Sequence, residues 1–535
     1  MIRSFRFLTV AALLVAAFLL PAHAGAAPSV VDPNLAVRTA AEGFDQPISI
    51  AFIGQNDMLV LEKASGKVKR VVNGVVQGTV LDLAVNSASE RGLLGIALDP
   101  QFFVSGRVFL FWSESTTGAD SAELAETPLL GNRVDRFMWN GSTLTFEQNI
   151  IRTRAFQADA GQPLRGNHDG GVLRFGPDGK LYIVQGDTGR RGQLQNLANG
   201  PFGPGIPDDQ FGGPAPDNAH MTGVILRLNS DGTTPASNPF FGAGAAMGGE
   251  VGANVQKIFA YGLRNSFGMA FDPVSGDLWE QENGDDSFTE LNRAEPGFNS
   301  GWVQIMGPPE RIDQFKAIET TVTPNPPDPF AATYFGLQQI RWLPTNIADT
   351  PGAALSRLFM LPGAHYSAPE FSWKYEVAPA GIGFLDSRAL GPQYQNDLFV
   401  GAARDFLEGG ALFRFNLTGN RRKIGVDDPR LEDRVADNLH KWEITESETL
   451  LFGRDFGIGT DVQTGPNGNL FVVSLTDGSI YEVYRPAKPH DAGTRAPLAA
   501  DSHRQPPPAA WRHRGRRAAA RRSGAPCGRG VPSAI

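Results

Sequence analysis

The sequence predicts an all-β fold, a six-bladed β-propeller with long inserted loops on one face. The first indication is composition: 62 Gly, 39 Pro and 35 Phe in 535 residues, with only 19% charged residues, are typical of turn-rich β proteins. The second is a hairpin pattern that recurs six times without helical periodicity, as in repeat architectures. The third is the uneven spacing of these hairpins along the chain. The long stretches between them are interpreted as inserted loops, which in a compact domain usually carry function.

Each repeat consists of an apolar strand, a turn containing Pro, Asp, Asn or Gly, and a second apolar strand. A third strand often follows, as at 67–71 and 479–483. Six unrelated hairpins in a sandwich are the alternative, but the shared turn chemistry favours a repeat. Insertions at about 116–165, 188–255 and 303–380 are expected to form the walls of a cleft. The six hairpins are 48–61, 94–111, 171–185, 268–280, 383–400 and 461–473.

Residues 1–27 have the pattern of a secretory signal peptide. A short basic start is followed by an apolar run from Phe7 to Pro21 and then by small residues. An uncleaved membrane anchor is the alternative interpretation. Later apolar runs fall short of the roughly 18 residues of a spanning helix, so we expect a secreted or periplasmic protein with no membrane span when mature. Cys527 is the only cysteine, which excludes a disulfide framework and a cysteine-based metal site.

The propeller is predicted over residues 28–485, and 486–535 are predicted to be a disordered basic tail rich in Pro, Ala and Arg. The tail has ten Lys and Arg against two Asp and Glu, which leaves 38 basic and 54 acidic residues in the rest of the chain. A nucleic-acid-binding arm is one reading of the tail, but it lacks interleaved aromatic residues, and an accidental extension is favoured. The acidic body argues against nucleic acid as a partner.

His168 is the best candidate for an acid–base residue. Only four His lie between the leader and the tail, without metal-binding spacing, so a zinc site of clustered His is not expected. His168 precedes the third hairpin, which places it at a strand mouth, and imidazole can accept a proton near neutral pH. A plain hydrogen bond to a loop is the alternative role.

Two further clusters could carry chemistry. Arg264 and Asn265, which enter the fourth hairpin, could stabilise developing negative charge, or Arg264 could bridge two blades. The segment 280–290 holds five acids around Gly284 and suits Ca²⁺, although it lacks the alternating acids of an EF-hand loop. A solvated acidic loop is the alternative.

Taken together, these motifs resemble the soluble pyrroloquinoline-quinone-dependent glucose, aldose-sugar and sorbosone dehydrogenases, which are exported six-bladed propellers. The matching motifs follow family order over about 45–484. They are Glu90-Arg91-Gly92-Leu93-Leu94-Gly95, Asn167-His168-Asp169-Gly170-Gly171, Gly262-Leu263-Arg264-Asn265, Glu282-Asn283-Gly284, Glu290-Leu291-Asn292, Gly297-Phe298-Asn299-Ser300-Gly301-Trp302 and Asp461-Val462-Gln463-Thr464-Gly465-Pro466.

The resemblance implies roles for these residues. His168 would be the general base that takes the proton of the anomeric hydroxyl while hydride passes to the quinone. Arg264 would stabilise the reduced oxygen of the cofactor, beside Asn265. The carbonyls of Gly284 and Asp285 would hold the Ca²⁺ that polarises the quinone. The resemblance also implies a second, structural Ca²⁺ held by Glu290 and the backbone of Ser300. The other residues implied to contact the cofactor are Glu90, Asn167, His168 and Arg404.

The sequence departs from the family at several positions. Glu90 stands where the glucose enzymes have Gln, and its carboxylate would repel a tricarboxylate unless protonated or turned away. Asn167 replaces the acid that precedes the base in the glucose enzymes. Ile458 and Thr460 replace an Arg pair, and the loss of these two positive charges weakens cofactor binding. We therefore expect a divergent quinone-dependent dehydrogenase that oxidises an aldose or sugar aldehyde to a lactone or acid and passes electrons to an external acceptor. A non-catalytic carbohydrate- or protein-binding propeller is the alternative, and a Ca²⁺-dependent lactonase is a third reading.

Overall fold

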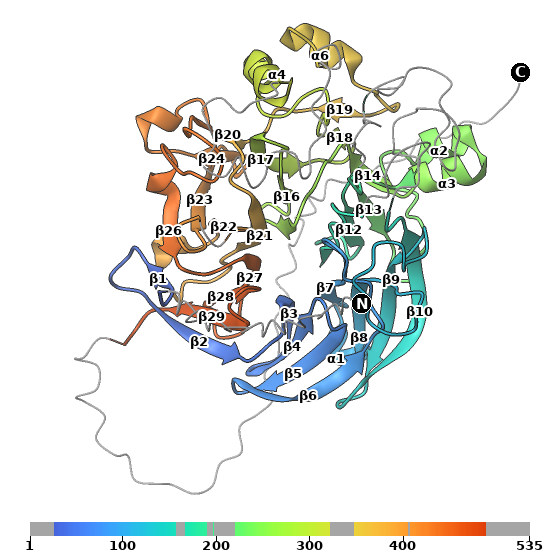
Figure 1. Ribbon diagram of the computed structural model, residues 1–535, viewed down its shortest axis with the longest axis vertical. Coiled ribbons are helices and arrows are strands. Elements are labelled where there is room, and N and C mark those ends of the chain that lie inside the picture. Colours follow the sequence, from blue (N-terminus) through green and yellow to red (C-terminus); the bar gives the residue numbers. More distant parts are fainter. Residues whose placement is uncertain are drawn as a thin grey trace, which may run out of the picture. The chain divides into compact units, whose positions relative to one another are not determined.

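The computed structural model describes residues 26–156, 166–189, 196, 220–320, 347–404 and 407–487. The described residues up to Pro486 belong to one compact unit, and their strands form six sheets (Figure 1). This arrangement confirms the predicted all-β propeller. The predicted leader and tail lie almost entirely outside the described residues. None of the helices in the described ranges is long and apolar enough to cross a membrane.

The first two sheets in chain order are antiparallel and have four strands each. Their strands are rich in Val, Ile, Leu and Phe, which suit a pleated, half-buried surface. The first sheet contains β3 (Pro47–Gly54), β4 (Asp57–Glu62), β5 (Lys67–Val72) and β6 (Val75–Asp82). The second contains β7 (Leu93–Leu98), β8 (Arg107–Ser113), β9 (Asn132–Trp139) and β10 (Leu144–Thr153).

The third and fourth sheets each extend a four-stranded antiparallel core with short parallel strands. The third contains β11 (Leu173–Phe175), β12 (Leu181–Gln185), β13 (Val224–Leu228), β14 (Ile258–Tyr261), β18 (Phe298–Asn299) and β19 (His365–Tyr366). The fourth contains β15 (Gly268–Phe271), β16 (Leu278–Glu282), β17 (Ser287–Ala294), β20 (Phe371–Tyr375) and β25 (Val435–Ala436).

The last two sheets draw in strands from the start of the described chain. The fifth contains β21 (Pro379–Phe384), β22 (Leu398–Ala402), β23 (Leu412–Thr418), β24 (Lys423–Gly425), β26 (Leu451–Arg454) and β1 (Ser29–Val30). The sixth contains β27 (Gly459–Thr464), β28 (Leu470–Ser474), β29 (Ser479–Tyr484) and β2 (Ala36–Glu42). Because β2 pairs with β29, the two ends of the described chain share one sheet, which closes the ring (Figure 1).

The six predicted hairpins are all present, and each lies in a different sheet. Their first strands contact one another in the order β3, β7, β11, β15, β21, β27 and back to β3. Glycine permits this approach at the centre: a Cβ on Gly95 would lie 2.0 Å from the carbonyl oxygen of Gly171, and one on Gly383 would lie 1.9 Å from that of Val462. Side chains cannot occupy these points of contact.

Apolar side chains fill the spaces between successive sheets. One cluster joins the sixth sheet to the first through Val473, Ile480, Ile50 and Val60. Another joins the fifth and sixth sheets and includes Phe399, Phe452 and Val472. Burial between sheets therefore stabilises the ring as a whole, and each sheet depends on both of its neighbours.

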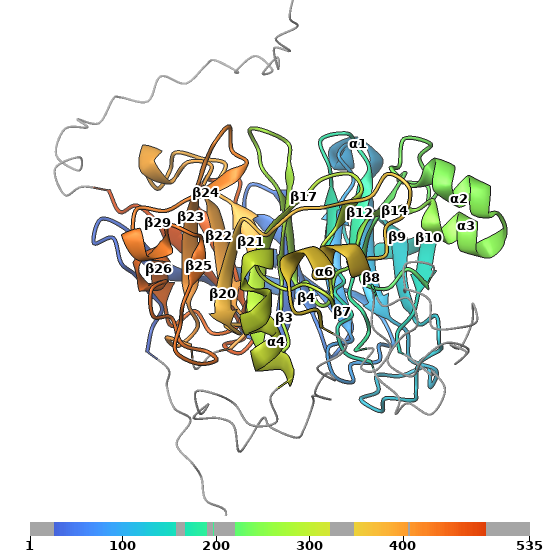
Figure 2. The ribbon, with the colours of Figure 1, turned by 90° about the horizontal axis from the view of Figure 1, so that it is seen from above.

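The predicted insertions contain more regular structure than expected. The segment 116–165 includes β9 and β10, and 188–255 includes β13. The segment 303–380 includes β19, β20 and helices, some of which are seen beside the strands in Figure 2. Long connections precede β9 and β13, from Ser113 to Asn132 and from Gln185 to Val224, so the repeat pattern missed these strands. The helices are α1 (Phe102–Ser105), α2 (Phe241–Met247), α3 (Gly249–Val255), α4 (Ile312–Thr320) and α6 (Pro351–Arg357), with 3-10 turns at Pro309–Arg311, Pro392–Tyr394, Pro429–Leu431 and Glu448–Leu450.

Candidate active site

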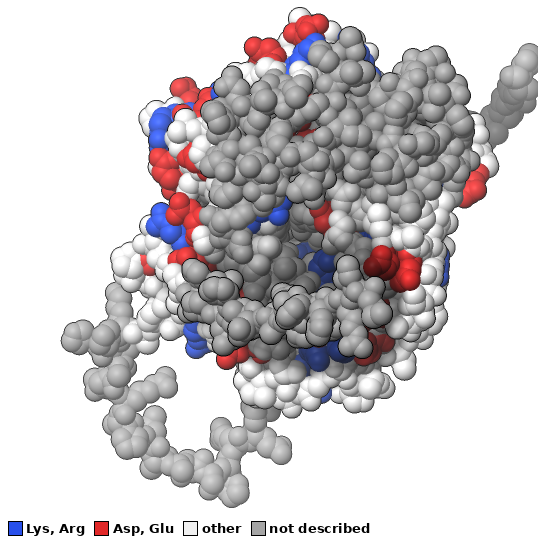
Figure 3. All heavy atoms as spheres, in the orientation of Figure 1, with Lys and Arg blue, Asp and Glu red and all other residues white. Residues whose placement is uncertain are grey.

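A cavity of about 290 Å³ lies where the six inner strands begin. This volume is close to the lower end of the range typical of small-molecule sites. Lys and Arg atoms are visible inside the central hollow in Figure 3. The structure brings much of the predicted site together at this strand mouth. Of the predicted residues, Glu90, His168, Arg264, Asn265, Gly284, Asp285 and Arg404 line the cavity, whereas Asn167, Glu290 and Ser300 do not.

His168 is held by a carboxylate that the sequence analysis did not assign. Its Nδ1 lies 2.6 Å from Oδ1 of Asp187, which follows β12. Oδ2 of Asp187 accepts a hydrogen bond from Nε1 of Trp302 at 3.0 Å, and Oδ1 also accepts one from the backbone N–H of Gly189 at 2.8 Å. This geometry favours a proton on Nδ1 and leaves Nε2 as the proton acceptor of the ring.

The environment of Asp187 keeps it ionised. Burial alone would raise the pKa of this carboxyl, but the charge and hydrogen bond of His168, together with Arg264, lower its pKa below the ordinary value. Asn167 is thus not the residue that compensates a protonated His168. His168 also has φ of 62°, a left-handed conformation that is uncommon outside glycine and that marks functional sites more often than ordinary loops.

Glu90 is turned toward two donors of the same site. Its Oε2 accepts from the backbone N–H of His168 at 2.6 Å and from Nδ2 of Asn265 at 3.3 Å. Burial lowers the pKa of Lys63, which also lines the cavity, although the negative charges of Glu90 and Asp169 oppose this shift. Glu90 therefore helps to position His168 and Asn265, and it interacts electrostatically with the ammonium of Lys63.

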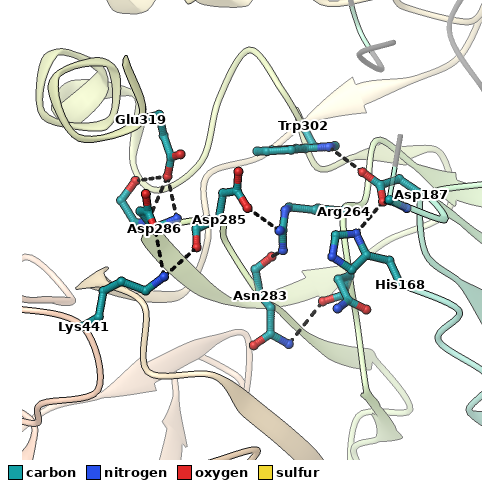
Figure 4. Close-up of polar contacts among 12 residues, drawn as sticks. His168, Asp187, Arg264, Asn283, Asp285, Asp286, Trp302, Glu319 and Lys441 are labelled. Atoms are coloured by element: carbon teal, nitrogen blue, oxygen red, sulfur yellow. Dashed lines mark hydrogen bonds and ion pairs between the residues drawn. The ribbon is translucent and has the colours of Figure 1, made fainter. Parts of the chain in front are cut away.

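Arg264 is a buried cation with fixed partners. Nη1 donates to the backbone O of Asn283 at 2.9 Å, and Nη2 donates to Oδ1 of Asp285 at 2.5 Å (Figure 4). Burial would lower the pKa of Arg264, but the charges of Asp285 and Asp187 outweigh burial and raise it. Its guanidinium carbon also lies 5.5 Å from the ring centre of Trp302. Arg264 thus remains charged and oriented at the cavity wall.

A second group of charges borders Arg264. Lys441 donates to the backbone O of Asp285 at 3.2 Å and to Oδ1 of Asp286 at 2.7 Å. Glu319, on α4, accepts from the backbone N–H groups of Asp286 and Ser287 at 2.9 and 3.0 Å. Burial and the charges of Asp286 and Asp285 raise the pKa of Glu319 to about 8. The acidic loop is consequently buried, which contradicts the solvated alternative.

Glu290 and Ser300 belong to a separate buried cluster of carboxyl groups. Asn292 Nδ2 donates to both Glu280 and Glu290 at 2.9 Å, and Ser300 Oγ donates to Oε2 of Glu282 at 2.7 Å. Burial raises the pKa of Glu280 to about 8 and that of Glu290 to about 7. Within the described ranges, no group of three or more His, Cys, Asp and Glu side chains is arranged to hold a metal ion.

The cavity has cations that the motifs did not reveal. Lys63, Arg174 and Lys441 line it together with Arg264 and Arg404. Arg174, on β11, donates to Oδ1 of Asp461 on β27 at 2.9 Å. These cations lie far apart in the sequence, so no short motif contains more than one of them. Ile458 and Thr460 do lie on the wall, as the departures from the family pattern implied.

The chain is similar to known sugar dehydrogenases in sequence and to one of their structures in fold. Aldose sugar dehydrogenase YliI of Escherichia coli is 25% identical over 464 residues, which cover 86% of this chain and 94% of the relative. Quinoprotein glucose dehydrogenase B of Acinetobacter calcoaceticus is 29% identical over 290 residues, which cover 51% of this chain and 55% of that protein. The crystal structure of the apo soluble aldose sugar dehydrogenase from Escherichia coli matches with a TM-score of 0.53 at 24% identity, covering 84% of this chain and all of that one.

The match to the family itself extends over residues 44–310, which include the first four hairpins and most of the cavity residues named above. The chain therefore belongs to the glucose/sorbosone dehydrogenase family.

Proposed function

We propose that this protein is a quinone-dependent dehydrogenase that oxidises an aldose or related sugar aldehyde at the anomeric carbon to a lactone or acid. The observation that carries the proposal is the His168–Asp187 pair on the wall of a cavity that also holds Arg264. We also propose that the protein is exported and that its six sheets are the six blades of the propeller. The electrons pass to an external acceptor. The family membership and the quinoprotein among the relatives support it.

The cavity residues fit pyrroloquinoline quinone, a tricarboxylate. Lys63, Arg174, Arg264 and Arg404 provide positive charge on several sides. The side-chain oxygen of Asn265 is buried and has no hydrogen-bond partner, so it is an acceptor that a ligand group could satisfy. These cations offset the loss of the Arg pair at Ile458 and Thr460. In this arrangement Arg264 and Asn265 hold the cofactor, and Arg404 contacts it from the fifth sheet.

When bound, the quinone supplies a hydride acceptor. His168 accepts the proton of the sugar hydroxyl at Nε2 while Asp187 holds Nδ1–H and stabilises the imidazolium that results. The sugar loses one hydride and one proton, which accounts for both electrons of the oxidation. Arg264 keeps positive charge near the position where negative charge develops, and the Asp285 carboxylate fixes its orientation.

Ca²⁺ is proposed at Glu290 and Ser300 on the chemistry of the completely buried carboxyl groups of Glu280 and Glu282, although the described side chains are not arranged as a metal-binding group without the ion. A divalent cation would offset their negative charge, and Oε2 of Glu280 has no hydrogen-bond partner in the described structure. The Ca²⁺ expected at the carbonyls of Gly284 and Asp285 does not fit as directly, because the Lys441 ammonium contacts the Asp285 carbonyl.

The proposal is tested by titrating residues 28–485 of the purified protein with pyrroloquinoline quinone, followed by dye-linked oxidation of a panel of aldoses. Saturable binding and sugar-dependent dye reduction are expected. A folded protein that binds aldoses but no quinone would overturn the proposal and would support a carbohydrate-binding propeller, the function that Ile458 and Thr460 favour.

A further inference from the structure

A buried lysine occupies a position predicted for a metal ion. Nζ of Lys441 lies 3.2 Å from the backbone O of Asp285, one of the two carbonyls assigned to Ca²⁺, and 2.7 Å from Oδ1 of Asp286. The Lys441 side chain is only 10% exposed, and the residue lines the cavity. Figure 4 shows its contacts with Asp285 and Asp286. In this structure, the positive charge at the Asp285 carbonyl is supplied by the Lys441 side chain.

The backbone around Lys441 is fastened to the fourth sheet. Asn438 accepts from the backbone N–H of Tyr375 at 2.8 Å and donates to its backbone O at 3.1 Å. The backbone N–H of Trp442 donates to the backbone O of Glu376 at 2.7 Å. These bonds on both sides of Lys441 hold its backbone against the fourth sheet, and the contacts with Asp285 and Asp286 place its ammonium.

The charges around this position suit one resident cation. The ammonium faces Asp285 and Asp286, and Nζ lies 4.9 Å from the ring centre of Trp442, which favours a cation over its face. A Ca²⁺ ion on the Asp285 carbonyl would share that oxygen with the ammonium, and two cations so close repel each other. Ca²⁺ and Lys441 thus exclude one another in this geometry.

We propose that the Lys441 ammonium replaces Ca²⁺ as the resident cation of the cavity and interacts with the oxygen atoms of a bound quinone. This inference rests on the proposed quinone-dependent function. An ammonium has three donors, and two of them are used by Asp285 and Asp286, so one is available to a ligand. Asp285 links two of the cations that line the cavity, because its backbone O contacts Lys441 and its carboxylate contacts Arg264.

The test measures quinone affinity by calorimetry in EDTA and in Ca²⁺, for the wild type, Lys441→Met and Lys441→Arg. Lys423→Met is the matched control, because Lys423 is 59% exposed and does not line the cavity. The wild type and the control are expected to bind quinone equally well in EDTA and in Ca²⁺, and quinone binding to Lys441→Arg is expected to remain independent of Ca²⁺ because the positive charge is kept. Loss of a charged hydrogen bond should weaken binding to Lys441→Met about tenfold or more in EDTA, with recovery in Ca²⁺.

Calcium titration without quinone gives an independent readout. Lys441→Met is expected to bind one more Ca²⁺ ion per chain than the wild type, because the Asp285 and Asp286 oxygens become available. Wild-type quinone binding that requires Ca²⁺ would overturn the inference and leave the proposed function standing. Unchanged quinone affinity and Ca²⁺ stoichiometry in Lys441→Met would overturn it as well. Absence of quinone binding to the wild type in both media would overturn the proposed function and the inference with it.

Discussion

His168 and Asp187 are close because β11 and β12 form an antiparallel hairpin. His168 precedes the first strand and Asp187 follows the second, so both lie at the same end of the hairpin. The hairpin was predicted, and the same reasoning applied to the residues that follow its second strand would have found Asp187. Lys441 and Glu319 could not be found in this way, because they lie on segments between strands whose paths depend on packing with the whole ring.

Replacing Asp187 by Asn is expected to lower kcat by at least about 10²-fold, because the amide no longer fixes the proton on Nδ1 or stabilises a charged His168. Quinone affinity should change little. Asp178→Asn is the matched control: Asp178 lies in the turn at the other end of the same hairpin and pairs with Arg227 outside the cavity. Dye-linked kinetics of the two variants provide the comparison, and equal rates would remove Asp187 from the mechanism.

Asp169 is expected to make the protein less stable as the pH rises. Its carboxyl is completely buried, and burial raises its pKa to about 8, although Arg91 and Asn132 act in the opposite direction. Between about pH 4 and pH 8 the folded state therefore binds a proton that the unfolded state has released. The free energy of unfolding should fall over this range and the contribution of Asp169 should level off above it.

Urea unfolding at pH 5 and pH 8.5 checks this expectation. Asp169→Asn cannot lose a proton, so its free energy of unfolding should fall less than that of the wild type between the two pH values. An identical fall in both proteins would show that Asp169 is ionised in the folded state throughout.

At the scale of the elements, the inner hairpins were predictable because each must meet two neighbours at the centre of the ring. This requirement produces the recurring apolar strands, and glycines stand where backbones touch, as at Gly95 and Gly383. The outer strands β9 and β13 each pair with two strands of their sheets, but long connections separate them from the inner hairpins, and β10 is reached only through β9. They were mistaken for parts of insertions for this reason.

Replacing Gly383 by Ala is expected to destabilise the protein by about 1–3 kcal/mol, because the new Cβ would lie 1.9 Å from the Val462 carbonyl oxygen and β21 and β27 would have to separate. Gly242→Ala is the control. Gly242 lies in α2 and has open space at its Cβ, so Ala should be neutral or slightly stabilising there. Denaturant unfolding measures both variants, and an unperturbed Gly383→Ala protein would contradict the close packing of inner strands.

At the scale of the whole molecule, the cavity is built from all six sheets, and β2 closes the ring against β29. The repeat pattern in the sequence was sufficient to predict this plan. It could not predict the balance of charge inside the cavity, because Lys63, Arg174 and Lys441 meet only when the ring closes.

Quinone binding is expected to stabilise the entire propeller, since the ligand would touch several sheets at once. At a free quinone concentration one hundred times Kd, the stabilisation should be about 2.7 kcal/mol. Thermal unfolding with and without quinone measures it. An unfolding temperature that does not change at saturating quinone would contradict a site shared among the sheets.

The most direct test of the account is the rate at which an aldose reduces the bound quinone, followed by absorbance in a single turnover, in the wild type and in His168→Gln. Both proteins are expected to bind quinone with similar affinity, since His168 acts on the proton of the sugar. Reduction should be about 10²- to 10⁴-fold slower in His168→Gln. Reduction at the wild-type rate in this variant would contradict the role of His168 as the base and, with it, the proposed mechanism.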